Sequence, residues 1–100
     1  MYQVVKRDGK IASFDISKIS TAITKAFEAT RMEYNPDIID LLALRVTADY
    51  QDKIHDGKIT VEDIQDSVED ILSKAGYADV AKAYILYRKQ REKIRNLNST

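Results

Sequence analysis

The sequence predicts an α+β fold, a four-helix domain capped by a small three-stranded mixed sheet. Two short β-rich stretches around an Asp-Gly pair open the chain and indicate a hairpin. Four longer segments then repeat apolar residues at helical spacing, and a brief β-rich stretch before the third supplies another strand. A lone hairpin is only marginally stable in water, so we expect the sheet to pack on the helices.

The predicted hairpin comprises residues 2–6 and 10–14. Asp8-Gly9 lies between them, and we expect a type I′ turn there, because this pair is favoured where both central residues need positive φ. The first helix should follow, with Asp15 or Ser17 as its N-cap. It is expected to run to about residue 31, with an apolar face made of Ile16, Ile19, Ile23, Ala26 and Phe27.

The second predicted helix begins at Asn35-Pro36, because asparagine caps helices well and proline favours the first helical position. It should run to about residue 53, before His55-Asp56-Gly57. Residues 58–61 then form the third strand beside the hairpin. The residues expected to recur along this second helix are Ile38, Leu41, Leu42, Arg45, Val46 and Asp49.

Thr60 is the predicted N-cap of the third helix, and Gly76 is placed for a left-handed C-terminal cap. The apolar stripe between them comprises Val61, Ile64, Val68, Ile71, Leu72 and Ala75. The fourth helix should start near Asp79 and end in a strongly basic segment. We expect one domain over residues 1–95, followed by a polar tail over 96–100. The fourth helix carries Val80, Ala83, Tyr84, Tyr87 and Ile94.

Composition restricts the class of protein. The 100 residues are 44% hydrophobic and 32% charged, as in a globular domain with one modest core. No apolar run approaches the roughly 18 residues needed to cross a bilayer, and no signal-peptide pattern opens the chain. The absence of cysteine excludes disulfides and a thiolate zinc site. We therefore expect a cytoplasmic protein without a membrane partner.

The net charge of zero hides a segregation of charge along the chain. Residues 1–31 hold six Lys/Arg and three Asp/Glu, residues 32–80 hold four and twelve, and residues 81–100 hold six and one. Two basic ends around an acidic middle can meet over a bound anion, or the like charges can occupy separate solvated faces. The segregation alone favours the second interpretation.

Enzyme signatures are scarce. There is no phosphate-binding glycine-rich loop, and the single histidine, His55, is expected at an exposed helix end. The acids of the middle segment recur three or four residues apart, which is typical of a solvated helix face. We expect no catalytic residue and no metal held by protein side chains.

The cationic cluster near the first helix breaks a local rule. With Asp15 as N-cap, Lys18 takes the third helical position, where a capping box places Glu or Gln. A helix start is already positive, so the lysine is misplaced unless an anion lies there. Arg7 offers a planar fork for phosphate oxygens, and Lys6 and Lys18 offer point charges. The alternative is a surface lysine whose ammonium group extends away from the helix.

A nucleotide also needs a place for its base. Positions near Val5, Val61 and Gln65 can supply apolar and hydrogen-bonding contacts, with Tyr84 and Tyr87 nearby on the last helix. Two tyrosines three residues apart are more often core or boundary residues. The residues alone thus indicate an anion- or nucleotide-binding α+β module.

Three segments of the chain form a recognisable combination, and they are VVKRDGKIASFDISKI (4–19), ITVEDIQDSVEDIL (59–72) and VAKAYILYRKQREKIR (80–95). Together they resemble the ATP-cone, the regulatory nucleotide-binding domain at the N-terminus of many ribonucleotide reductases. The combination of residues 5–9 with Phe14 and Lys18-Ile19 at this spacing is specific. The resemblance extends from about residue 2 to 95, and the C-terminal segment is most similar to the cones of anaerobic, glycyl-radical ribonucleoside-triphosphate reductases.

The resemblance assigns roles to individual positions. Val5 matches a position whose backbone meets adenine, and Val61 and Gln65 match the region that closes over the nucleoside. Ala12 departs from a glutamate that contacts the nucleotide in some cones, and Asp15 from an asparagine. Lys6, Arg7 and Lys18 match phosphate contacts, and Arg91 or its neighbours Arg88 and Lys89 match a C-terminal basic contact. The predicted nucleotide-binding residues are Val5, Lys6, Arg7, Asp15, Lys18, Ile19, Val61, Gln65, Tyr84, Tyr87, Arg88 and Arg91.

By this resemblance the domain is not itself catalytic and belongs to a parent reductase. The resemblance also implies that the polar tail over 96–100 can be the start of a linker to a missing catalytic domain. ATP sustains and dATP stops the activity of such enzymes through domain packing or nucleotide-dependent homo-oligomer contacts, with Mg²⁺ bound through the phosphates. One alternative is the cone of a nucleotide-sensing transcriptional repressor of reductase genes, a family that also carries a four-cysteine zinc ribbon. Another is a small nucleic-acid-binding protein that uses the basic helix over 82–95. The absence of cysteine disfavours the first, and the acidic middle disfavours the second.

Overall fold

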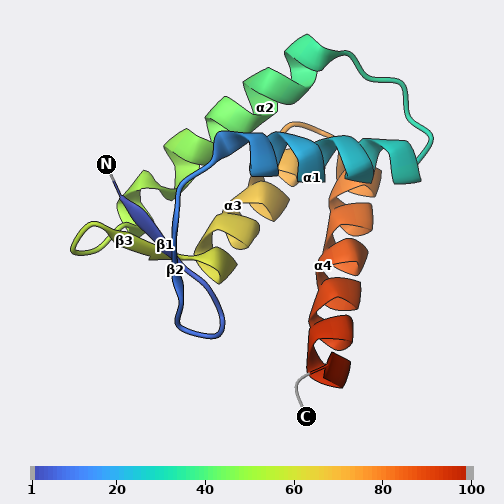
Figure 1. Ribbon diagram of the computed structural model, residues 1–100. Helices are drawn as coiled ribbons and strands as arrows, with labels where there is room; N and C mark the ends of the chain where they lie inside the picture. Colours follow the sequence, from blue (N-terminus) through green and yellow to red (C-terminus); the bar gives the residue numbers. More distant parts are fainter. Residues whose placement is uncertain (1, 99–100) are drawn as a thin grey trace.

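Four helices and one three-stranded sheet make up the computed structural model, which describes residues 2–98, with side chains to residue 94 (Figure 1). The predicted α+β fold is confirmed. The elements are, in chain order, β1 (Gln3–Val5), β2 (Ile11–Ser13), α1 (Ile16–Ala29), α2 (Pro36–Asp49), the short 3₁₀ helix η1 (Tyr50–Lys53), β3 (Lys58–Thr60), α3 (Val61–Lys74) and α4 (Ala78–Asn98).

The sheet is mixed, with β1 in its centre. β2 pairs with β1 antiparallel, and β3 pairs with β1 parallel. Val4 lies opposite Ala12 on one side and Ile59 on the other, and both Val4 and Ile59 are buried. Side chains alternate across a strand, so this central register directs one face of the sheet onto the helices.

The turn chemistry differs from the prediction at Asp8-Gly9. Gly9 has a φ of 84°, but Asp8 is not among the residues with positive φ, so the turn is not type I′. Asp8 instead accepts a hydrogen bond from the Lys10 N–H at 2.9 Å. The pair with two positive φ values is Asp56-Gly57, at 54° and 72°, in the connection to β3.

The predicted N-caps are confirmed. Asp15 accepts a hydrogen bond from the Ser17 N–H at 3.0 Å, Asn35 from the Ile38 N–H, and Thr60 from the Asp63 N–H. Each side chain satisfies an N–H that has no partner within its helix. The starts of α1, α2 and α3 are therefore set by side chains that the sequence identifies.

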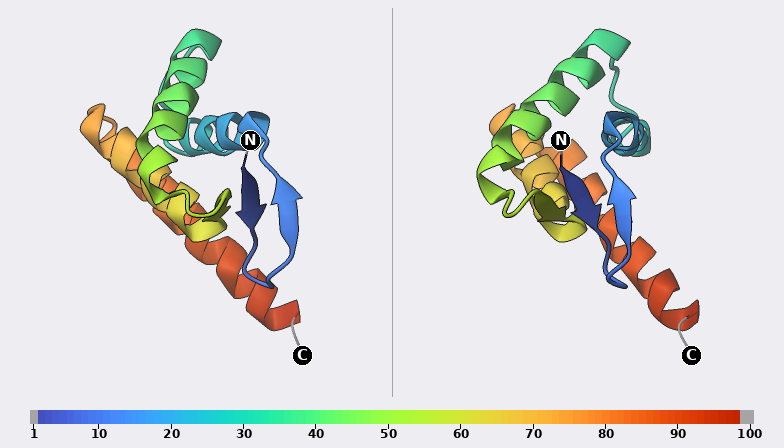
Figure 2. Two further views of the ribbon diagram at one scale, coloured as in Figure 1. Left: turned by 90° about the vertical axis from the view of Figure 1, so that its left-hand side faces the viewer. Right: turned by 60° about the vertical axis from the view of Figure 1, so that its left-hand side comes forward.

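The helices pack in a ring, since α1 contacts α2 and α4, and α3 contacts the same two helices. The core lies between them and under the sheet. In Figure 1, the C-terminal half of α4 projects beyond the other helices, and both views of Figure 2 show the β1–β2 hairpin beside it. No helix among residues 2–98 is long and apolar enough to cross a membrane.

Two details of the helices correct the expectations. The buried face of α2 consists of Ile39, Leu42, Ala43 and Val46, whereas the predicted Leu41 is 56% exposed. Compared with the predicted face, the buried face of α2 is shifted by about one residue, because Ile39 and Ala43 pack inward. The short helix η1 follows directly and buries Tyr50 in the same core. At the other end of the chain, α4 continues to Asn98, through the first residues of the predicted tail.

Candidate functional site

The two basic ends of the chain meet. A cavity of about 430 Å³, called here the cationic hollow, lies between the hairpin turn, the first turn of α1, the start of α3 and the outer half of α4. The basic ends therefore meet, as the first of the two interpretations of the charge pattern requires, and the anion between them stays a prediction. The cationic hollow is lined by Lys6, Arg7, Asp8, Lys18, Val61 and Arg91.

Lys18 lies at the third position of α1, as predicted, with the N-cap carboxylate of Asp15 within reach of its charge. The first turn of α1 contains no acidic residue, and within the described part of the chain neither Lys6 nor Lys18 forms an ion pair. The hydrogen bond from the Ser17 hydroxyl, and then that from its N–H, lower the pKa of the Asp15 carboxyl. That carboxylate is thus committed to capping the helix.

Arg7 has carboxylate partners. Its Nε lies 2.6 Å from Glu62 Oε1 at the start of α3, and its Nη1 lies 3.2 Å from Glu92 Oε1 on α4. The guanidinium side chain is 23% exposed, whereas the two glutamates are 41% and 49% exposed. The predicted phosphate fork is therefore held between two acidic side chains at the rim of the cationic hollow.

A second cavity of about 260 Å³, the apolar hollow, continues from the first and shares Lys18, Val61 and Arg91 with it. Tyr84 is buried in its wall, and burial raises the pKa of the tyrosine hydroxyl. Arg91 lies over the ring of Tyr87, 6.0 Å from its centroid. The remaining lining residues of the apolar hollow are Ile19, Ala22, Ile64, Gln65, Val68 and Arg88.

Gln65 brings an unsatisfied polar atom to the apolar hollow. Its Oε1 is buried, yet no hydrogen-bond partner for it is found among the described residues. Leaving a buried acceptor unpaired costs about 1–3 kcal/mol, so such atoms usually have a partner in protein or solvent. A ligand with an N–H or O–H group in the apolar hollow would supply that partner.

A narrower crevice of about 120 Å³ lies under the hairpin and also reaches Lys18 and Val61. Lys6 and Asp15 line it together with Ala12, whose small side chain leaves space where some relatives are expected to carry glutamate. Val5 is the one predicted nucleotide-binding residue, all of them in the described part, that lines none of these three cavities. It is half-buried in β1, beside Lys6.

Arg88 binds two acidic side chains of a neighbouring helix, and the sequence did not predict these contacts. Its Nη1 donates to Asp66 at 2.8 Å and to Glu69 at 2.9 Å, both on α3. Burial opposes the charge, but these hydrogen bonds outweigh it and raise the pKa of Arg88. Arg88 lines the apolar hollow, but its charge is balanced by α3.

A family model described as "ATP cone domain" matches residues 2–93. The chain belongs to the ATP-cone family. This confirms the resemblance seen in the three sequence segments, which together fall almost wholly inside the matched region.

Relatives of this cone are ribonucleotide reductases of several kinds. The cone is 42% identical to the ribonucleoside-diphosphate reductase subunit alpha of Chlamydia pneumoniae over 92% of its own length. It is 40% identical to the vitamin B12-dependent ribonucleoside-diphosphate reductase of Mycobacterium tuberculosis over 93%, and 35% identical to the anaerobic ribonucleoside-triphosphate reductase of Haemophilus influenzae over 98%. The chain spans only 9%, 12% and 14% of these relatives, respectively.

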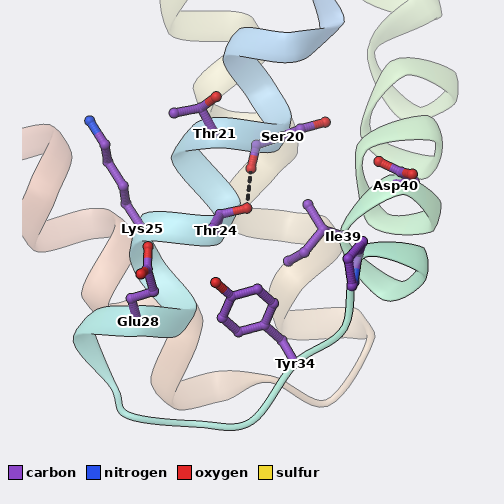
Figure 3. Close-up of a pocket in the computed structure, with 9 residues that line it drawn as sticks. Ser20, Thr21, Thr24, Lys25, Glu28, Tyr34, Ile39 and Asp40 are labelled. Carbon is purple, nitrogen blue, oxygen red and sulfur yellow. Dashed lines mark hydrogen bonds between the residues drawn. The ribbon is translucent and has the colours of Figure 1, made fainter.

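Another cavity of the cone, of about 460 Å³, lies between α1 and α2 and is open to solvent (Figure 3). Its walls carry Lys25, Glu28 and Asp40, with the Tyr34 ring directed toward Thr24. The Thr24 hydroxyl already donates to the Ser20 carbonyl at 2.8 Å. With two carboxylates and a single lysine, this cavity lacks the positive charge that a polyphosphate requires.

Sequence reasoning missed the acidic residues at the rim of the cone's cationic hollow. Glu92 carried a visible signal, because it is the one acid in the last twenty residues, amid six Lys/Arg. Glu62 gave no such signal in the sequence, since it is one of several acidic residues of α3. The exposed His55 lies near the turn to β3, and among residues 2–98 no group of three or more metal-ligating side chains occurs.

Proposed function

We propose that this ATP-cone is an allosteric domain that binds ATP or dATP and thereby controls the activity of a ribonucleotide reductase catalytic domain in the same parent chain. One observation carries the proposal. Lys6, Lys18 and Arg91 converge on a cavity that continues into an apolar one, and none of the three forms an ion pair within residues 2–94. This is the surface that a nucleoside triphosphate needs.

The two parts of the ligand are proposed to bind in different cavities. The phosphates lie in the cationic hollow against Lys6 and Lys18, with Mg²⁺ bound through their oxygens. The nucleoside lies in the apolar hollow or the narrower crevice, near Val61 and Gln65. The volume of about 430 Å³ for the cationic hollow alone falls in the range of small-molecule sites.

Control of activity requires the two effectors to favour different states of the enzyme. ATP and dATP differ by one ribose hydroxyl, whose hydrogen bond contributes roughly 0.5–1.5 kcal/mol. Allosteric coupling energies are typically about 1–3 kcal/mol, so this difference supports a graded switch. Nucleotide-dependent contacts between copies would sharpen this switch.

The parent enzyme is proposed to be an anaerobic, cytoplasmic ribonucleoside-triphosphate reductase that supplies deoxyribonucleotides for DNA replication.

Titration calorimetry and thermal unfolding with ATP and with dATP, both with Mg²⁺, test the proposal. Each nucleotide should raise the melting temperature, since a ligand that binds only the folded state stabilises it. The Lys6→Ala/Lys18→Ala double variant should lose most of that shift.

The matched control is Lys10→Ala/Lys58→Ala, which removes two exposed lysines that line neither the cationic nor the apolar hollow within the described structure. This control should keep the full shift. Undiminished binding by the Lys6/Lys18 variant would show that the phosphates bind elsewhere.

A further inference from the structure

Arg7 differs from the other cations of the cationic hollow because carboxylates from two helices already bind it. Glu62 holds its Nε at 2.6 Å, and Glu92 holds its Nη1 at 3.2 Å. Among residues 2–94, Lys6, Lys18 and Arg91 form no such pair. Any anion that reaches the Arg7 fork must compete with these two side chains.

The two glutamates are not equivalent competitors. Glu62 binds Nε, which leaves the Nη groups of the guanidinium available, and its contact is the shorter one. Glu92 occupies Nη1 over the longer distance, and its side chain is the more exposed. A phosphate group carries more charge and more acceptor oxygens than a carboxylate, so it can replace Glu92 while Glu62 stays bound.

We infer that Glu92 is an internal competitor that occupies Arg7 in the absence of ligand and is displaced when a triphosphate binds. The inference rests on the proposed function for the identity of the ligand, but it concerns the phosphate moiety alone. Glu92 therefore sets the affinity of the site without contacting the nucleoside. Its displacement also breaks the side-chain contact between the β1–β2 turn and α4, the two elements seen side by side in Figure 2.

The test is a titration of Glu92→Gln with ATP and with inorganic triphosphate. Exposed ion pairs are weak, so we expect both ligands to bind the Glu92→Gln variant only roughly two- to fivefold more tightly than they bind the unmodified chain. The control is Asp8→Asn, which removes one negative charge from the wall of the same hollow and keeps an oxygen to accept the Lys10 N–H. Asp8→Asn should tighten binding less than Glu92→Gln.

A double-mutant cycle separates competition for Arg7 from the general loss of a negative charge. In an Arg7→Gln background, Glu92→Gln should improve binding no more than Asp8→Asn does. An equal gain from Glu92→Gln with and without Arg7 overturns the inference, as does a gain no larger than that of the control. Melting temperatures without ligand verify that each variant is folded.

The proposed function fails by a different result. ATP that binds no better than inorganic triphosphate would show that the nucleoside is not recognised, whatever Glu92 does. If neither ligand binds the unmodified chain measurably, Glu92→Gln must create binding that Asp8→Asn does not, and otherwise the inference is wrong.

Discussion

The guanidinium of Arg88 on α4 and the carboxylate of Glu69 on α3 lie 2.9 Å apart, and Asp66 completes the contact at 2.8 Å. The Arg88 side chain is only 17% exposed, so these bonds join two helices at a partly buried position. This geometry gives Arg88 a role in helix packing, beside the role in nucleotide binding that the family resemblance predicts.

We therefore expect Arg88→Met to lower the free energy of unfolding by about 1 kcal/mol, since the ion pair is partly screened by solvent. Nucleotide affinity, corrected for stability, should fall much less than in the Lys6/Lys18 variant. Urea unfolding and calorimetry measure the two effects. The control is Lys82→Met, an exposed lysine of the same helix that lines none of the three cavities within the described structure. A large loss of affinity with unchanged stability would make Arg88 a ligand contact instead.

The end of α1 predicts a stabilising substitution. Arg31 adopts a φ of 56°, and the N–H of Met32 donates to the Phe27 carbonyl at 3.3 Å across this left-handed residue. Glycine adopts this conformation without strain, so Arg31→Gly should raise the free energy of unfolding by about 0.5–1 kcal/mol. The urea midpoint should rise with an unchanged slope.

Gly76 provides the converse measurement, because it ends α3 with a φ of 91° and a Cβ there would meet no atom within 4 Å. Gly76→Ala should therefore lower the free energy of unfolding by about 1 kcal/mol through backbone strain alone. A destabilised Arg31→Gly beside a destabilised Gly76→Ala would mean that the Arg31 side chain makes a stabilising contact.

The caps were predictable from the sequence, and the turns were less so. Asp15, Asn35 and Thr60 are local signals, since each needs only its own next few residues to bond. Asp8-Gly9 and Asp56-Gly57 have the same two letters, but only the second pair adopts two positive φ values. The difference depends on loop length and strand pairing, which a dipeptide does not encode.

The candidate site shows a similar limit. Lys18 was identifiable because it breaks a rule of helix starts, whereas Arg91 was named only through the resemblance to the ATP-cone. The pairing of Arg7 with Glu62 and Glu92 joins residues 55 and 85 positions away, so it depends on how α3 and α4 pack against the hairpin. The exposure of Leu41 also arises from packing, because spacing alone fits either of two adjacent faces of α2.

The cap of α1 predicts a dependence of stability on pH. Hydrogen bonds from Ser17 lower the pKa of Asp15 from its ordinary value of 3.8. A carboxyl with a lowered folded pKa contributes its full stabilisation above the unfolded value, and that contribution is lost as pH falls through the folded pKa. Asp15→Asn keeps an N-cap acceptor but cannot titrate there.

We therefore expect the unfolding free energy of the unmodified chain to fall more steeply than that of Asp15→Asn below about pH 4. Urea unfolding at a series of pH values between about 6 and about 2.5 measures both slopes. Parallel curves for the two chains over this range would show that Asp15 does not contribute to the pH dependence of stability.

Lys18 allows the conflict between stability and binding to be tested directly. Glu at this third helical position can complete a capping box and compensates the helix dipole, so Lys18→Glu should raise the free energy of unfolding by about 0.3–1 kcal/mol. The same change places a negative charge in the wall of the cationic hollow and should abolish the thermal shift given by ATP. Lys18→Gln should give an intermediate result in both measurements. Lys10→Glu, which reverses an exposed charge on the hairpin, should leave the ATP shift nearly intact. If Lys18→Glu retained the ATP shift, the lysine would be an ordinary surface residue and the first turn of α1 would not bind phosphate.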